Sequence, residues 1–177
     1  MKLLVGLALL GLASSQVEYT RQAIMDDAGK YHLYWNPGAD VTDLIHFKVE
    51  VENLGWTGLG FNSFGLGQTM VQADLHIFWV DEAGVPQISD RHGIRNGYPP
   101  IDPSQDVEIV SGSKNSTHTT VEFRRRRDTG DRYADRVLDE NIRCVLYAYN
   151  PMLPPDADGV RYHGRDRRGA NCIDLFD

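Results

Sequence analysis

The sequence predicts an all-β protein with the architecture of an antiparallel, immunoglobulin-like β-sandwich. Hydrophobic and polar residues alternate in several short runs, which is the period of a strand with one buried face. Turn-forming residues separate these runs at short intervals, as they do in sandwiches and barrels. There is no internal repeat in the 177 residues, so we expect a single domain over residues 17–177.

The N-terminal residues 1–15 have the pattern of a secretory signal peptide. A basic start at Lys2 precedes an apolar run over residues 3–13, which ends in small residues. That run is shorter than the roughly 20 apolar residues of a membrane span, and the alternative is a buried N-terminal helix. We therefore expect a secreted, extracellular protein without a membrane span, whose mature chain begins at Gln16.

The first half of the domain contains three predicted strands. Residues 31–35 form the first, and residues 45–51 alternate Ile, Phe, Val and Val with His, Lys, Glu and Glu. Residues 75–80 are more uniformly apolar, which predicts a central strand covered on both faces. A single helical turn is expected over residues 41–44.

The second half continues with the same period. Val121 and Phe123 mark one half-buried strand, residues 145–149 mark another, and residues 172–176 are the predicted last strand. A second helical turn is expected over residues 132–138. Together with the earlier runs, these strands are enough for two packed sheets.

The charge balance argues against nucleic acid as the main partner. The formal net charge is −7 and the sequence pI is about 5.3. The local exception is the run Arg124–Arg127 at the end of a predicted strand. We interpret it as a solvated strand edge that discourages edge-to-edge pairing, with an anionic partner as the alternative.

Two cysteines and one N-glycosylation sequon are candidates for modification if the protein is exported. Cys144 and Cys172 form one disulfide or remain two buried free thiols, and sequence spacing does not decide between them. The sequon at Asn115 falls in a polar turn, where an exported protein is expected to carry a glycan.

Four segments, taken together and in order, resemble the DOMON domain family. The closest likeness is to the N-terminal DOMON domains of dopamine beta-hydroxylase and DBH-like monooxygenases, and it implies a β-sandwich. The segments are Trp-Thr-Gly-Leu-Gly-Phe-Asn at 56–62, Met-Val-Gln-Ala-Asp-Leu-His-Ile at 70–77, Asp-Pro-Ser-Gln-Asp at 102–106 and Tyr-His-Gly-Arg-Asp-Arg-Arg-Gly at 162–169.

The chain also departs from those enzymes. It ends at Asp177 without the two copper-binding domains, and its histidines form no His-His or His-X-His pair. Gly130 stands where the relatives carry a cysteine that tethers the domain to the rest of the enzyme. We therefore expect a stand-alone ligand-binding module rather than an enzyme. The alternative is a fragment or accessory of a copper-dependent monooxygenase.

The resemblance to extracellular cytochromes of the family implies haem b binding and electron transfer. Their axial ligands are one Met and one His, which correspond here to Met70 and His163. Met/His ligation raises the reduction potential of haem iron. Phe61, Phe64, Leu66 and Tyr162 are near these ligands in sequence and are expected to line the haem slot. Otherwise Met70 is a core side chain and His163 a surface histidine.

The resemblance to the monooxygenase domains implies a different ligand, a structural cation. Its carboxylates correspond to Asp74 and Asp106, and its backbone carbonyls to Leu75 and Arg91, a set of oxygen ligands suited to Ca²⁺. Without a cation, the two aspartates would cap a turn and a strand end. This second hypothesis is an extracellular module that binds protein or sugar, with aromatic residues available for sugar stacking.

Overall fold

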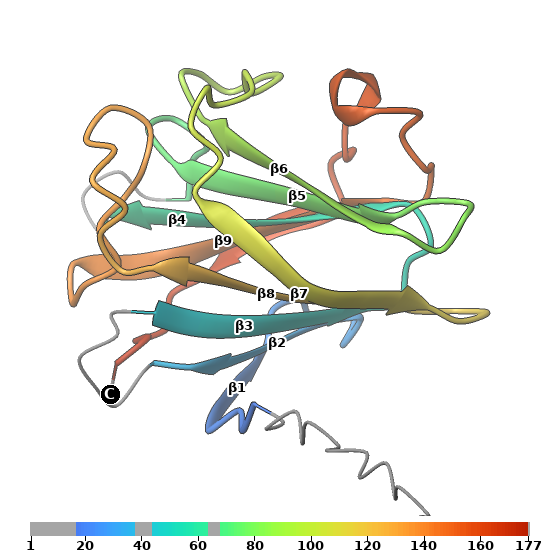
Figure 1. Cartoon of the computed structure of the whole chain (residues 1–177), viewed down its shortest axis with the longest axis horizontal. Helices are drawn as coiled ribbons and strands as arrows, with labels where there is room; N and C mark the ends of the chain where they lie inside the picture. Colours follow the sequence, from blue (N-terminus) through green and yellow to red (C-terminus); the bar gives the residue numbers. More distant parts are fainter. Residues whose placement is uncertain (1–16, 38–43, 64–67, 177) are drawn as a thin grey trace, which may run out of the picture.

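The computed structural model describes residues 17–37, 44–63 and 68–176, and it confirms the predicted sandwich of two antiparallel sheets (Figure 1). Each sheet has five strands. The first sheet has the order β1-β2-β3-β8-β7, with β1 Arg21–Ile24, β2 Tyr31–Asn36, β3 Leu44–Val51, β8 Thr119–Arg126 and β7 Val107–Lys114. The second has the order β10-β9-β4-β5-β6, with β10 Arg168–Asn171, β9 Ile142–Asn150, β4 Trp56–Ser63, β5 Asp74–Val80 and β6 Pro86–His92.

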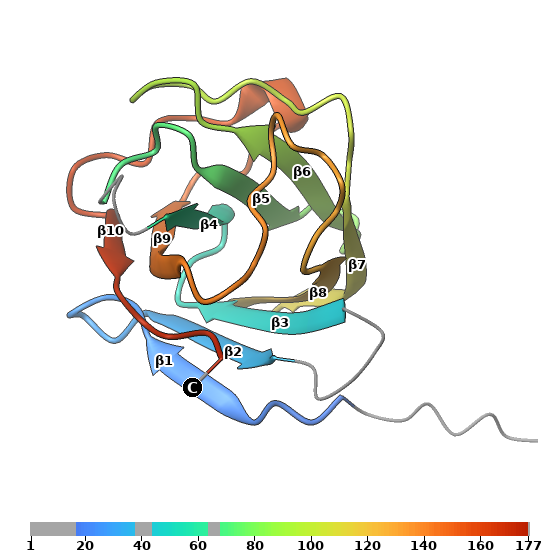
Figure 2. The ribbon, with the colours of Figure 1, turned by 90° about the vertical axis from the view of Figure 1, so that its left-hand side faces the viewer.

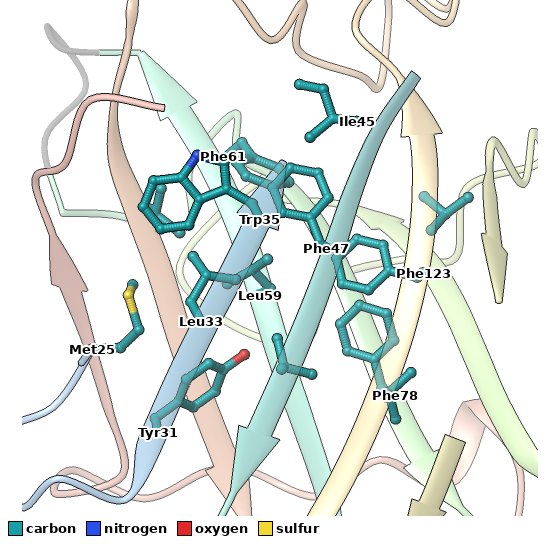
Figure 3. Close-up of a cluster of buried hydrophobic side chains, with 14 of the residues drawn as sticks. Met25, Tyr31, Leu33, Trp35, Ile45, Phe47, Leu59, Phe61, Phe78 and Phe123 are labelled. Carbon is teal, nitrogen blue, oxygen red and sulfur yellow. The ribbon is translucent and has the colours of Figure 1, made fainter. Parts of the chain in front are cut away.

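The main core fills the space between the two sheets. Phe47 and Phe123 stack at 5.1 Å between ring centroids, and Phe78 of the opposite sheet lies 4.6 Å from Phe123. Figure 3 shows these rings among aliphatic side chains from both layers. The alternating burial of β3 and β8 follows from their period-two sequences. As predicted, β5 is buried along its whole length.

The interpretation of the arginine run as a solvated edge is wrong. Strand β8 lies inside its sheet, paired with both β3 and β7. Arg124 forms an exposed ion pair with Glu108, whereas Arg125 points between the sheets and is 1% exposed. The reason is the alternation itself, which places Arg125 on the same face of β8 as Val121 and Phe123.

The predicted last strand is also misplaced. The final strand, β10, covers Arg168–Asn171 and ends just before Cys172. The segment after it crosses from the edge of the second sheet to β1 and β2 (Figure 2). There the indole nitrogen of Trp35 donates to the carbonyl of Leu175 at 2.9 Å. The apolar residues at 173–176 therefore pack on the core without forming a strand.

Of the first predicted helical turn, at 41–44, the structure describes only Leu44. Leu44 begins β3, and residues 41–43 lie outside the described residues, as do residues 1–16 of the predicted signal peptide. In the second predicted region, residues 132–134 form one turn, closed by a hydrogen bond from the backbone nitrogen of Asp135 to the carbonyl of Asp131 at 3.3 Å, and residues 135–138 do not continue it as a helix. The one helical element described is a 3₁₀ turn, η2 at Ala157–Gly159, which the carboxylate of Asp156 caps.

Candidate functional site

A cavity of about 470 Å³ lies over the outer face of the second sheet. Its floor consists of the outward-facing residues of β4, β5 and β9, and its walls are the segments at 96–99 and 160–165. This volume is within the range of about 300–1,000 Å³ that small-molecule sites occupy. The apolar and glycine residues of the floor and its margin are Trp56, Gly58, Gly60, Leu75, Ile77, Leu146, Ala148 and Val160.

Two glycines of β4 make the floor shallow enough to accept a flat ligand. A methyl group on Gly60 would come within 2.6 Å of the Leu75 side chain, so this position requires glycine. A methyl group on Gly58 would meet only ordinary contacts, 3.4 Å or more from its neighbours. Gly58 is therefore not needed for packing, and its missing side chain leaves room in the cavity.

Hydrogen bonds to backbone carbonyls hold the walls of the cavity in place. The indole nitrogen of Trp56 donates to the carbonyl of Arg161 at 3.1 Å, and Asn150 donates to the carbonyl of Tyr162 at 2.7 Å. The buried guanidinium of Arg91 donates to the carbonyl of Pro99 in one wall and to that of Ala157 beside the other. The walls are thus fixed to the sheet rather than free.

His163 lies in the second wall and is buried, with 8% of its surface exposed. Its Nδ1 is 2.7 Å from the carbonyl of Gly164, so Nδ1 carries the proton and Nε2 keeps its lone pair. Burial lowers the pKa of His163, and the nearby Arg168 and Arg167 lower it further. Since the ring is neutral, Nε2 is suited to bind a metal ion.

Met70 lies in the loop before β5 and lines the same cavity as His163. It packs against a small cluster of Ala73, Leu75 and Leu146. The predicted pair, 93 positions apart in sequence, therefore meets at one cavity. Among the other expected lining residues, Tyr162 lines the cavity.

The remaining residues expected around the haem slot do not contribute to it. Phe61 points into the core between the sheets, so its prediction as a lining residue is wrong. Phe64 and Leu66 lie outside the described residues.

The residues predicted to bind a cation lie at one end of the sandwich, where a buried network of charged groups joins the sheets. Asp74 is fully buried at the start of β5. Its Oδ2 accepts hydrogen bonds from the guanidinium of Arg125 and, at 3.0 Å, from the backbone nitrogen of Arg136. The positive charge beside Asp74 is therefore an arginine from the opposite sheet, which the sequence analysis did not identify.

His76 and Asp90 extend this network. The two nitrogens of His76 lie 3.4 Å from Asp74 Oδ1 and 3.0 Å from Asp90 Oδ1. Asp90 Oδ2 accepts a hydrogen bond from the backbone nitrogen of Asp106 at 3.2 Å. Asp106 thus reaches the network through its backbone. Leu75 and Arg91 are cross-strand partners at the same end.

The charged groups of the network shift one another's ionisation. Burial alone would lower the pKa of His76, but the carboxylates of Asp74 and Asp90 raise it. Burial raises the pKa of Asp135 to about 7, and the charge of Asp74 adds to this shift. Asp135 Oδ2 is 3.7 Å from the guanidinium of Arg125, which is too long for a hydrogen bond.

The ligand atoms of Asp74, His76 and Asp90 lie within 4.8 Å of one another, as they do in metal sites. However, the guanidinium of Arg125 touches both Asp74 and His76 and supplies the positive charge that a metal ion would bring. Two carboxylate oxygens, Asp74 Oδ1 and Asp102 Oδ2, are buried and accept no hydrogen bond.

The two cysteines are neighbours across β9 and β10 and are both free thiols. The pairing of Asn171 with Val145 makes Cys172 and Cys144 the next facing pair. Burial raises the pKa of the Cys144 thiol to about 11. Cys172 is exposed, so the alternative of two buried thiols is wrong for it.

Asn115 lies in the exposed turn between β7 and β8. Its Oδ1 accepts hydrogen bonds from the backbone nitrogens of Thr117 and His118, both at 2.8 Å. The amide nitrogen that carries an N-linked glycan is on the other side of the same group.

Comparison with known proteins gives three kinds of match. The family model of the DOMON domain matches residues 26–150. MOXD1 homolog 2 of Drosophila melanogaster is 38% identical over 127 residues, which cover 71% of this chain and 15% of that protein. DBH-like monooxygenase protein 1 of Gallus gallus is 32% identical over 176 residues, which cover 99% of this chain and 27% of that protein. The chain therefore spans about a quarter or less of these relatives.

Two solved structures share the fold. One is the cytochrome b domain of pyranose dehydrogenase from Coprinopsis cinerea, with a TM-score of 0.62 and 18% identity over 82% of this chain and 76% of that one. The other is the cytochrome domain of Myriococcum thermophilum cellobiose dehydrogenase, with a TM-score of 0.62 and 16% identity over 82% and 74% of the two chains. The described residues of this chain include no helix long and apolar enough to cross a membrane.

Proposed function

Because this chain belongs to the DOMON domain family, we propose that it is a ligand-binding module that holds haem b in the cavity on its second sheet and transfers electrons. One observation carries the proposal: Met70 and His163, from segments far apart in sequence, line the same cavity. Two solved structures with this fold are cytochrome domains, which supports the proposal by analogy of fold.

The residues that line the cavity are suited to bind haem b. Haem iron held by one Met and one His has no open coordination position and supplies one-electron transfer. His163 is neutral, and its Nδ1 hydrogen bond to Gly164 leaves Nε2 as the ligand atom. Met70 offers a thioether from a partly buried position beside Leu75 and Leu146. The glycine floor excludes water once a flat ring covers it, because the surrounding side chains are apolar.

A titration with ferric haem tests this function. We expect the purified domain, prepared without haem, to bind it in a one-to-one complex and to show the sharp visible bands of a six-coordinate low-spin cytochrome after reduction. Gly58→Leu is the test variant, because it places a side chain in the cavity at a position where an added Cβ meets only ordinary contacts. This variant should keep the thermal melt of wild type and lose haem binding. Absence of haem binding to wild type would reject the proposal.

We propose that the module is not catalytic by itself, although its relatives include proteins named as monooxygenases. The alternative is that it is one part, or an accessory, of a copper-dependent monooxygenase, in keeping with the fraction of the relatives that it spans. Assay of the purified chain with copper, ascorbate and a phenylethylamine separates the two. Hydroxylated product would contradict the non-catalytic proposal.

A structural cation is a second candidate, favoured by the unpartnered buried oxygens on Asp74 and Asp102. Oxygen ligands of this kind suit Ca²⁺. The predicted set remains Asp74 and Asp106 with the carbonyls of Leu75 and Arg91. A chelator should then lower the melting temperature of wild type but not of the Asp74→Ala, Asp106→Ala double variant. An unchanged wild-type melt would reject the cation and leave Arg125 and His76 as the counter-charges of Asp74.

We also propose that the module is exported and carries a glycan on Asn115, whose turn is exposed. Expression in secreting cells should yield chain in the medium that starts near Gln16 and loses mass on treatment with an N-glycosidase. Asn115→Gln should remove that mass difference. A secreted chain that retains Met1 would contradict the predicted cleavage.

A further inference from the structure

Three arginine side chains, of Arg161, Arg165 and Arg168, line the cavity, and its lining contains no Asp or Glu. All three residues are exposed. Within the described part of the chain, their guanidinium groups form no ion pair and no hydrogen bond. We call these three residues the cavity arginines.

The cavity arginines differ from three other arginines of this acidic protein. The net charge is −7, and Arg124 pairs with Glu108 at 2.8 Å, Arg125 with Asp74 and Arg132 with Asp128. Unpaired arginines around a cavity that has no carboxylate raise the local concentration of anions. Their planar guanidinium groups match carboxylates with two parallel hydrogen bonds.

The cavity thus separates two kinds of surface. The sheet side is apolar, with Leu75, Ile77, Leu146 and Ala148, and the cationic groups come from the segment around His163 and from β10. A ligand that satisfies both surfaces is amphipathic, with a flat apolar body and carboxylates along one edge.

We propose that the cavity arginines bind the carboxylates of this ligand, which for haem b are its two propionates. The inference rests on the proposed function and deepens it, because it gives the ligand an orientation with its carboxylate edge toward β10. Arg168 and His163 line the same cavity. A ligand bound at His163 would therefore have its anionic edge within reach of these arginines.

The test compares ferric haem b with its dimethyl ester, which has the same ring but no free carboxylates. An exposed pair of this kind is worth a factor of about 1.4–5, so two propionates give wild type a preference of about 2- to 25-fold for the free acid. The Arg165→Gln, Arg168→Gln variant should lose this preference. The Arg126→Gln, Arg132→Gln variant removes the same charge from exposed positions that do not line the cavity, and it should keep the preference.

The outcomes separate the two proposals. Equal affinity of wild type for haem b and its ester, or an unchanged preference in the Arg165→Gln, Arg168→Gln variant, would overturn the carboxylate inference while haem binding stands. Failure of wild type to bind either probe would reject both proposals. Added salt should reduce the preference of wild type, because exposed ion pairs are screened. Thermal melts confirm that both variants are folded.

Discussion

Arg125 on β8 donates a hydrogen bond to the carboxylate of Asp74 on β5, and both side chains are fully buried between the two sheets. The two residues are 51 positions apart in sequence. Their contact joins the first sheet to the second through charged side chains. Removing one partner of a buried pair leaves a charge without a counter-charge, which is far more costly than losing an exposed pair.

Asp74→Ala is therefore expected to destabilise the domain by about 3–5 kcal/mol. Asp106→Ala should cost less than about 1 kcal/mol, because Asp106 contacts Asp90 through its backbone nitrogen, which the substitution retains. Urea unfolding followed by fluorescence measures both. Glu108→Ala, which breaks the exposed pair with Arg124, is the control and should also cost less than about 1 kcal/mol. Equal losses for Asp74 and Asp106 would contradict the assignment.

The contribution of Asp135 to the stability of the domain is expected to fall as the pH rises from about 4 to 7. An unfolded aspartate releases its proton near its ordinary pKa of 3.8, whereas burial holds the pKa of Asp135 at about 7 in the fold. Between these two pKa values the folded state binds more protons than the unfolded state. The stabilising contribution of Asp135 is therefore fully present below pH 3.8 and is lost as the pH rises through about 7. His76, whose folded pKa is raised, acts in the same direction.

Asp135→Asn tests this pH dependence, since it retains the shape of the side chain without the charge. The variant should be more stable than wild type at pH 8 by about 1 kcal/mol and should lose less stability between pH 5 and 8. Unfolding curves measured across this range give both values. A variant with the same pH profile as wild type would show that Asp135 is ionised in the fold without cost.

Met70→Ala and His163→Ala are expected to have different effects on bound haem. Loss of the thioether should lower the reduction potential, because Met/His ligation raises it. Loss of the imidazole should weaken haem retention, measured by transfer of haem to apomyoglobin. Met152→Ala and His118→Ala are matched controls that remove the same side chains from positions outside the cavity lining. If both test variants behave as their controls do, the ligand assignment is wrong.

Arg91→Lys is expected to loosen the walls of the cavity. The guanidinium donates to the carbonyls of Pro99 and Ala157 at once, and its ring partner Tyr98 lies 5.1 Å away. A lysine ammonium does not reproduce the planar geometry by which one guanidinium donates to both carbonyls. One buried carbonyl therefore loses its hydrogen-bond donor, at a cost of about 1–3 kcal/mol. Haem affinity should fall with stability. Arg95→Lys, at an exposed position in the segment after β6, should change neither haem affinity nor stability.

Cys144 and Cys172 are expected to form a disulfide when the chain is exported through an oxidising compartment. They face each other across β9 and β10, and oxidation by a protein disulfide donor removes one hydrogen from each thiol. The bond should add about 2–4 kcal/mol to stability. Mass spectrometry under non-reducing conditions detects it, and a reductant should lower the melting temperature of wild type but not of Cys144→Ala, Cys172→Ser. Two free thiols in the secreted protein would refute this pairing.

The sequence by itself determined the fold class and five of the ten strands. Period-two alternation at residues 45–51 and the mostly apolar run at 75–80 depend only on which face each side chain occupies, so they can be read locally. The same period contained a signal for the buried network, because Arg125 continues the inward series of Val121 and Phe123. That signal was missed, since an arginine in a run of four is most often solvated.

Only the tertiary structure decided which residues meet. Met70 and His163 carry no local pattern that joins them, and their common cavity arises because the loop before β5 and the segment before β10 converge on one face of the second sheet. Likewise, the partner of Asp74 comes from the opposite sheet. Such contacts depend on the order of strands and the packing of two layers, which short-range alternation does not encode.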